Sequence, residues 1–492
     1  MTTPISDFAE AYARRDPLRL HMPGHKGRGS LERLDITEVD GADVLYHSRG
    51  IIRESEENAA ALFGSRRTLY SAEGSSLCIR AMLTLALFRA REQGLPPLIL
   101  AGRNAHSSFL TAAALLDFQI RWLYGSQPLV CLPAPGELSE ALSVLSTPPA
   151  AVYLTSPDYL GNRADIAALA EVCRERDIPL LVDNAHGAYL RFLSSECGGG
   201  HPIELGADLV CDSAHKTLPV LTGGAYLHIG AKAPDIFFRE AERALRLFAS
   251  TSPSYLILES LDRCNSWLSG EGPSALARTA AMTGELKTRL RAAGYNVVGE
   301  TYYDDQAYPP PGSVQTKRDT DNRRAMAERN TDNRRAPRGA HTGFSEPLKI
   351  TLAPKSRGYT GNRLHELLRE QGIECEFSDP DYLVMMLSPA IEESGFRLLE
   401  DALLSLEPLP PLPESIPLPP RAETVFSLRE ALLSPCEEVP LSRCPGRILA
   451  DPCVSCPPAV PILICGERIT ESAVSCFRYY GQRETLLCLK ED

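Results

Sequence analysis

The chain has 492 residues, of which 43% are apolar and 23% are charged, and its formal net charge is -12 at pH 7. This composition is typical of a soluble globular protein with more than one domain. The sequence has no long basic run, which argues against nucleic acid as the main partner.

The chain begins with MTTPISDFAEAYARRD, which has no apolar core of signal-peptide length. No stretch approaches the ~18 uninterrupted apolar residues of a membrane span, so we expect a cytoplasmic protein without a membrane partner. Its 14 cysteines are expected to be reduced thiols. One C-x-x-C pair, CVSC at 453–456, lacks the second close pair of a usual zinc site, and we predict no metal.

Short apolar runs alternate with helical patterns from about residue 60 to residue 230. Strands are expected at 96–102 (PPLILAG), 150–156 (AAVYLTS), 178–183 (IPLLVD) and 207–212 (ADLVCD). The segment between the second and third strands places Ile166, Leu169, Ala170 and Cys173 on one helical face. This alternation predicts an α/β fold with a mainly parallel sheet covered on both faces. Such sheets bind ligands at the carboxyl ends of their strands.

The pattern changes after residue 260. Residues 264–300 are expected to form a helix and then a strand, and 346–406 a small α+β domain. Between them lies a polar stretch, 304–343, in which TDNRRA occurs twice. We expect a mobile surface insertion there, with a basic interaction loop as the alternative. A proline-rich stretch at 407–420 is typical of a linker, and the remaining residues would form a further small domain.

Polar residues follow the four expected strands. His106 lies in RNAHSS after the first strand, and PDYLG follows the second. Asp183 closes the third strand and precedes NAHGAY, and Lys216 lies in SAHK after the fourth. Upstream, the turn formed by Gly74, Ser75 and Ser76 begins an apolar helix. These residues are expected to converge at one edge of the sheet.

Each of these groups fits one part of a pyridoxal phosphate site. The Gly-Ser-Ser turn offers backbone N–H groups and hydroxyls to a phosphate. Asp183 would keep the pyridine nitrogen protonated, so that the ring accepts electrons. Lys216 would form a Schiff base with the aldehyde, and His106 would stack on one face of the ring. The candidate cofactor-binding residues at these strand ends and at the turn are Gly74, Ser75, Ser76, His106, Asp183, Ala185, His186, Ser213, His215 and Lys216.

Each feature also has a simpler structural interpretation. A Gly-Ser-Ser turn is often an ordinary helix cap, and an aspartate at a strand end often caps or pairs. A lone lysine is usually solvated, and His186 could be structural. The order of phosphate turn, histidine, aspartate and Ser-x-His-Lys along successive strand ends favours the cofactor site.

Several longer stretches resemble the Orn/Lys/Arg decarboxylase family, in its short bacterial type without an N-terminal receiver-like domain. They are LHMPGHKG (20–27), RNAHSS (103–108), DNAHGAY (183–189), SAHKTL (213–218), TSPSYLILESLD (251–262), EPLKITL (346–352), GIECEF (372–377) and CPPAVPILICGERIT (456–470). The resemblance implies a fold like that of aspartate aminotransferase, with smaller α+β C-terminal domains. The implied domains are a segment near the active-site mouth (1–35), a large cofactor-binding domain (36–262), a small domain (263–406), the linker (407–420) and a C-terminal domain (421–492).

The resemblance also implies roles for individual residues. Lys216, Asp183, His106 and His215 would be catalytic. The family forms homodimers with the site at the interface, which would bring Thr251 or Ser252 of the partner subunit to the phosphate. His25 and Lys26 become candidates near the substrate, and Glu467 a possible anchor for a cationic side chain.

Three positions depart from the family pattern. Asn184 stands where short members usually have Glu, Ser107 where Lys is usual, and Ala459 where Gly is usual. None of them removes a group that the chemistry requires, but they leave the identity of the substrate open.

The resulting prediction is α-decarboxylation of a basic amino acid: arginine, lysine or ornithine. Amino transfer on the same fold is one alternative, and Arg357 or Arg363 would then hold the substrate carboxylate. A non-catalytic interaction protein that retains the scaffold is the other.

Overall fold

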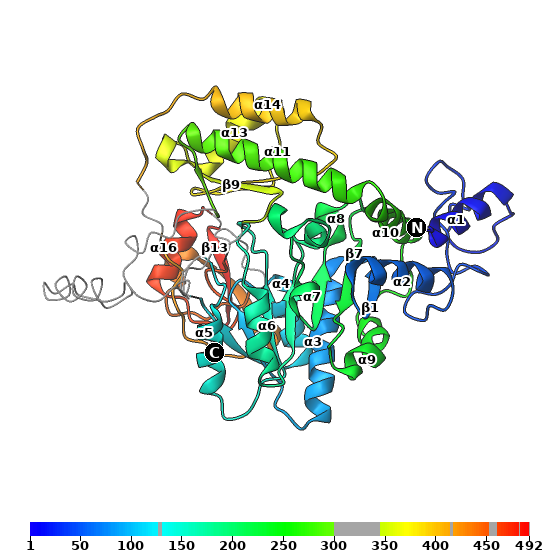
Figure 1. Ribbon diagram of the computed structural model, residues 1–492. Coiled ribbons are helices and arrows are strands. Elements are labelled where there is room, and N and C mark those ends of the chain that lie inside the picture. The colour runs from blue at the N-terminus through cyan, green and yellow to red at the C-terminus, as the bar shows by residue number, and fades with distance from the viewer. Residues whose placement is uncertain (126–129, 300–344, 414–416, 452–459, 482, 492) are drawn as a thin grey trace, which may run out of the picture.

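The computed structural model describes residues 1–125, 130–299, 345–413, 417–451, 460–481 and 483–491. Its centre is a seven-stranded sheet of order β1-β7-β6-β5-β4-β2-β3 (Figure 1). The strands are β1 (Arg67–Ser71), β2 (Leu98–Gly102), β3 (Gln119–Leu123), β4 (Ala151–Thr155), β5 (Leu180–Asp183), β6 (Leu209–Asp212) and β7 (Ala225–Ile229). Six of the strands run parallel to one another, and β7 runs antiparallel to them. The predicted α/β fold with a mainly parallel sheet is therefore confirmed.

Helices cover both faces of this sheet. They are α2 (Ile51–Phe63), α3 (Gly74–Glu92), α4 (Ser107–Leu116), α5 (Pro135–Ser143), α6 (Ile166–Arg174), α7 (Pro202–Leu205), α8 (Ala214–Thr217), α9 (Asp235–Arg246) and α10 (Tyr255–Ser269), with α1 (Pro4–Arg15) packed on α2 and α10. Leu181 of β5 packs into the core on the α3 and α9 side, whereas Leu180 and Val182 face the core of α5 and α6. This alternation explains the near-continuous apolar strands, because each face must be buried. The four predicted core residues of α6 are all buried.

Two smaller sheets follow in the chain. One is antiparallel, of order β10-β11-β9-β8, with strands β8 (Asn296–Val297), β9 (Lys349–Ala353), β10 (Phe377–Ser378) and β11 (Leu383–Met386). Its neighbours are α11 (Gly272–Ala292), α13 (Gly361–Arg369) and α14 (Glu393–Leu404), drawn in green to orange above the large sheet in Figure 1. The other pairs β12 (Cys436–Pro440) with β13 (Thr485–Leu489), beside α15 (Leu428–Leu433) and α16 (Glu471–Tyr479).

Some local expectations need correction. The segment 264–300 was expected to hold one helix, but α10 ends at Ser269 with Gly270 as its C-cap, and α11 begins at Gly272 with a proline in its first turn. Strands β1, β3 and β7 belong to the sheet although no strand was expected there. The insertion at 304–343, the CVSC pair and Ala459 lie outside the described residues. None of the helices in the described part of the chain is long and apolar enough to cross a membrane.

Candidate active site

The strand register brings the predicted site residues to one edge of the sheet. Thr155 of β4 lies beside Asp183 of β5, and Asp183 lies beside Cys211 of β6. The loops that follow these strands therefore begin side by side at the carboxyl ends of the parallel strands. This is the position at which open α/β sheets bind ligands.

Asp183 is 2% exposed, and its carboxylate has partners on both oxygens. The hydroxyl of Tyr153 donates to Oδ2 at 3.2 Å, and the backbone N–H of Ala185 donates to Oδ1 at 3.2 Å. The thiol of Cys211 lies 3.6 Å from Oδ1. These neutral donors orient the carboxylate without neutralising it, so it can still pair with a cationic nitrogen.

Lys216 lies on α8, a single turn that begins directly after β6, and its side chain is exposed. Its Nζ is 3.2 Å from Nε2 of His186, which lies in the loop after β5 and is buried. The ring of His186 also packs edge-on against the ring of Tyr159 at 5.5 Å. The structure thus places Lys216 against a second predicted site residue instead of leaving it solvated alone.

Hydroxyl groups from three elements meet at the start of α3. Ser75 Oγ accepts from Ser213 Oγ at 2.7 Å, and Ser76 Oγ accepts from Ser108 Oγ at 2.7 Å. Gly74 has φ +70°, and a Cβ at this position would meet no atom within 4 Å. The N-terminus of a 19-residue helix therefore opens into free space that is lined by hydroxyls. This combination of N–H groups, hydroxyls and helix dipole suits a phosphate.

His106 links this hydroxyl group to the rest of the site. It is the N-cap of α4: its Nδ1 accepts the backbone N–H of Ser108 at 3.2 Å and lies 3.0 Å from the Ser108 hydroxyl. Desolvation lowers the pKa of His106. The carboxylate of Asp183 opposes that shift, and the smaller effect of the Lys216 charge adds to it. The imidazole therefore stays neutral and presents an uncharged ring.

The other predicted phosphate ligands are His215, Thr251 and Ser252. Nδ1 of His215 lies 3.0 Å from the carbonyl of Gly224, so Nδ1 carries the hydrogen and Nε2 accepts in the neutral ring. Thr251 and Ser252 are exposed in the segment between α9 and α10. In this chain, the adjacent Ser250 N–H donates at 2.7 Å to Glu73, the residue before Gly74. A contribution of Thr251 or Ser252 from a partner subunit stays a prediction.

The weaker candidates have other contacts. His25 pairs with Asp35 at 3.2 Å, and Lys26 donates to the carbonyl of His21, all within the N-terminal segment. Glu467 is buried and accepts from Arg103 at 2.7 Å. This ion pair joins the C-terminal segment to the loop that carries His106. In this chain Glu467 therefore binds Arg103, not a cationic substrate side chain.

The arginines required by the amino-transfer alternative are also engaged elsewhere. Arg357 is buried against Tyr295 and donates to the carbonyls of Ala293 and Leu406. Arg363 is half exposed and pairs with Glu366 on the same helix. Ser107, one of the departures from the family pattern, is the first residue of α4.

Three side chains at the site were not anticipated from the sequence. Tyr153 donates to Asp183 from within β4, and Ser108 joins His106 to Ser76. Lys349, at the start of β9, is buried with its Nζ 3.4 Å from Nδ1 of His186. Ser108 stands in RNAHSS and Lys349 in EPLKITL, so the motifs included both residues, but their contacts depend on the tertiary structure.

A second buried cluster lies behind the loop after β5. The carboxylate of Asp212 accepts from Asn184 Nδ2 at 2.6 Å and lies 2.9 Å and 3.0 Å from Nε2 of His201 and His228. Nδ1 of His201 accepts the N–H of Ile203, so its hydrogen is on Nε2. The three side chains are close enough to share a cation, but this hydrogen bonding already satisfies the carboxylate. We call Asp212, His201, His228 and Asn184 the Asp212 cluster.

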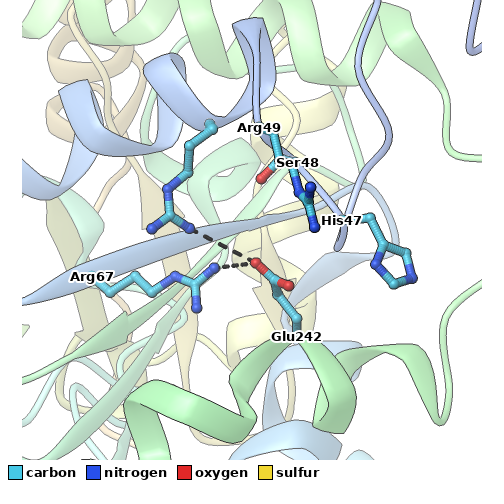
Figure 2. A pocket seen from close by; sticks show the side chains of 6 residues that line it. His47, Ser48, Arg49, Arg67 and Glu242 are labelled. Carbon is cyan, nitrogen blue, oxygen red and sulfur yellow. Dashed lines mark hydrogen bonds and ion pairs between the residues drawn. The ribbon is translucent and has the colours of Figure 1, made fainter.

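A polar pocket of about 420 Å³ lies at the opposite end of the strands. It is lined by His47, Ser48, Arg49, Arg53, Arg67 and Glu242. Figure 2 shows Glu242 between two arginines, and ion pairs join it to Arg67 and Arg53. The register places Arg67 beside Ile229, away from the edge where β6 ends. The pocket has neither a lysine nor a free carboxylate, so the groups for the predicted chemistry gather around Lys216.

Comparisons with known proteins agree with this location. The family model described as Orn/Lys/Arg decarboxylase, major domain, matches residues 3–395, and that of the C-terminal domain matches residues 421–486. The chain belongs to the Orn/Lys/Arg decarboxylase family. The resemblance seen in the sequence is therefore confirmed, and the matches extend beyond the motifs.

Individual relatives and structures of this family match nearly the whole chain. An arginine decarboxylase of Halalkalibacterium halodurans is 27% identical over 97% of this chain and 93% of its own length. One of Bacillus subtilis is 26% identical over 96% and 92%. The structure of a Francisella novicida lysine decarboxylase has a TM-score of 0.74 at 15% identity, covering 99% of this chain and 81% of that one. At that identity, the last comparison shows the shared fold.

The residues present fit pyridoxal phosphate, the cofactor predicted from the sequence. The open turn at Gly74 leaves room where a larger residue would project, and hydroxyls of Ser75 and Ser213 line it. Asp183 offers a buried carboxylate and Lys216 an accessible amine near the same edge. An anionic group, a basic ring nitrogen and an aldehyde would each find a complementary partner.

Proposed function

We propose that this chain is a pyridoxal phosphate-dependent decarboxylase of a basic amino acid, with arginine as the first substrate to test. The observation that carries the proposal is the convergence of Asp183, Lys216 and the Gly74–Ser76 turn at the carboxyl edge of the sheet. Arginine comes first because the long sequence matches include arginine decarboxylases.

The protein groups have distinct tasks in this proposal. Bound pyridoxal phosphate would supply an electron sink for the bond between Cα and the carboxylate. Asp183 would hold a proton on the ring nitrogen, and the turn at Gly74 with Ser75, Ser76 and Ser213 would hold the phosphate. His106, kept neutral, would cover one ring face and Ala185 the other.

Lys216 would act twice. Its amine would bind the cofactor covalently before substrate arrives, and Nζ or His215 would then return a proton to Cα after carbon dioxide leaves. His215 can donate from Nε2 only as the imidazolium, because Nδ1 already donates to the carbonyl of Gly224. Lys216 therefore has the simpler protonation cycle and is our first choice as proton donor.

We further propose a cytoplasmic homodimer that shares its sites, with Thr251 or Ser252 of the partner near the phosphate. Both residues are exposed in the single chain, which leaves them accessible to a second copy. The amine product would be a precursor of polyamines.

The direct test is an assay of the purified protein with pyridoxal phosphate and, separately, arginine, lysine and ornithine. Release of carbon dioxide together with the matching amine from one of them is the expected result. Lys216→Ala should abolish turnover, and turnover at the wild-type rate in this variant would overturn the assignment. A keto acid in place of the amine would establish amino transfer instead. Protein without an absorption band that borohydride removes would indicate a non-catalytic scaffold.

A further inference from the structure

A row of buried polar groups extends from Lys216 into the small antiparallel sheet. Nζ of Lys216 is 3.2 Å from Nε2 of His186, and Nζ of Lys349 is 3.4 Å from Nδ1 of the same ring. Lys349 also lies 3.8 Å from Glu346 and donates to the carbonyl of Tyr159 at 3.3 Å. The side chains of Lys349 and Glu346 are 1% and 2% exposed. One imidazole thus stands between two lysines from different parts of the fold.

The hydrogen bonds of such a row depend on one another. A neutral imidazole has one N–H donor and one acceptor nitrogen, and an ammonium group can only donate. Two ammonium groups therefore cannot both bond to a neutral His186. If one lysine is charged and donates to its nitrogen, the other nitrogen carries the hydrogen and is satisfied by a lysine in the free-amine form.

The imidazole itself is neutral. Burial and the charges of Lys349 and then Lys216 hold the pKa of His186 well below its ordinary value. His106 and His215 act in the same direction. Protonation of the ring would place a third positive charge among these groups.

Burial lowers the pKa of Lys349, but an acidic neighbour at 3.8 Å supports its charged form. The Tyr189 hydroxyl and the Leu348 N–H both donate to Glu346 Oε1, as expected for a carboxylate. Burial lowers the pKa of Lys349, while Glu346 and then Asp158 oppose that shift. Burial raises the pKa of Glu346 to about 7, so Glu346 is an anion in mildly alkaline solution and supports the ammonium of Lys349.

We propose that Lys349 is a positioning residue that acts through His186 on Lys216. Its ammonium donates to Nδ1 of His186, which fixes the ring hydrogen on Nε2, facing Lys216. Nε2–H then donates to Nζ of Lys216 and stabilises the free amine, whose proton has passed to solvent. This deepens the proposed function and rests on it, because only a free amine can attack the aldehyde of the cofactor.

Other charged groups act on this row and stay in place when Lys349 is changed. On the Lys216 side they are Asp183, His106 and His215, and on the Lys349 side they are Asp158, Glu346 and Glu376. Glu346 is the exception, because Lys349 lowers its pKa, so Lys349→Met also changes the ionisation of Glu346. Lys349→Met/Glu346→Gln removes the opposite charge as well, in case the single variant leaves Glu346 unpaired and does not fold.

The experiment measures the reactivity of Lys216 directly. Full-length protein, stripped of any cofactor with hydroxylamine, is labelled with trace acetic anhydride between pH 6.5 and 10. Acetylation of the peptide containing Lys216 is quantified by mass spectrometry, and circular dichroism confirms folding. Lys349→Met should raise the midpoint of the Lys216 curve by about one pH unit, which is about a tenfold lower rate at pH 7.5. Lys232→Met, at an exposed lysine after β7, is the matched control and should leave the curve unchanged.

A second background separates action through His186 from a simple charge effect. His186→Phe keeps an aromatic ring against Tyr159 but removes both nitrogens. In the His186→Phe background, Lys349→Met should shift the midpoint of the Lys216 curve by less than half as much as in wild-type protein. An equal shift would show that Lys349 does not act through His186. An unchanged midpoint in folded Lys349→Met and in the double variant would overturn the proposal altogether. The labelling needs neither cofactor nor substrate, so its outcome is independent of whether the chain decarboxylates arginine.

Discussion

Two clusters lie beside adjacent strand ends, and each combines histidine with charged side chains. In the Asp212 cluster, one carboxylate has three donors, and its pKa is held below the ordinary value: burial alone would raise it, but His201 and His228 prevail. In the row of Lys216, His186 and Lys349, two lysine side chains flank one neutral ring. The carboxylate of the first cluster accepts from a donor on every side chain around it, whereas the two lysines of the second cannot both donate to the neutral ring. The first arrangement is suited to stability and the second to reactivity.

The strongest test of this difference between the clusters is the same substitution, aspartate to asparagine, made once at each site. Asp183→Asn should fold normally, because its carbonyl oxygen still accepts from Tyr153 or Ala185, but kcat should fall roughly 100-fold or more through loss of charge stabilisation. Asp212→Asn should instead lower the free energy of unfolding by about 3 kcal/mol, because it weakens charge-assisted hydrogen bonds in a buried site. Urea unfolding and the decarboxylation assay measure both. A stable but inactive Asp212→Asn protein would contradict the comparison.

Asn184→Asp should affect the Asp212 cluster alone. It puts a second carboxylate where the amide now donates to Asp212 at 2.6 Å. Like charges raise the pKa of the new group above its unfolded value, so stability should decrease as pH rises. We expect a loss of about 2 kcal/mol at pH 8 and a smaller one at pH 5. Unfolding curves at the two pH values measure this, and an equal loss at both would indicate a packing effect.

The pH dependence of stability separates the clusters in wild-type protein. The pKa of His186 is lower in the folded state than the ordinary ~6.5, so the unfolded chain binds more protons and stability falls as pH decreases from 7. This contributes about 2 kcal/mol by pH 5, and His186→Phe should remove that part. The pKa of Asp212 is lowered, so its contribution is present above the unfolded value and is lost below about pH 4. Asp212→Asn should remove the pH dependence of stability only in that lower pH range.

The sequence predicted the parallel sheet and the edge at which the site forms, because buried strands and the residues after them are local patterns. It placed Asp183 and Lys216 correctly at the ends of β5 and β6. It missed β1 and β7, in which Arg67, Thr68 and His228 interrupt the apolar pattern. His186 and Tyr159, which contact Lys349, are 163 and 190 positions away, so only the packing of the small sheet against the large one reveals these contacts. The sequence likewise did not show that Glu467, a possible anchor, is bonded to Arg103, which is 364 positions away.

The smallest effects are expected from the hydroxyls that support each cluster. The hydroxyl of Thr68 lies 2.8 Å from Nδ1 of His228, and that of Tyr153 donates to Asp183 at 3.2 Å. Thr68→Val and Tyr153→Phe each remove one neutral hydrogen bond, and each should cost about 1 kcal/mol of stability. Only Tyr153→Phe should also lower kcat, by a few-fold, because a less well oriented Asp183 holds the ring proton less firmly. Equal activity in the two variants would mean that Ala185 and Cys211 position the carboxylate without Tyr153. An activity loss confined to Thr68→Val would mean that the Asp212 cluster affects catalysis.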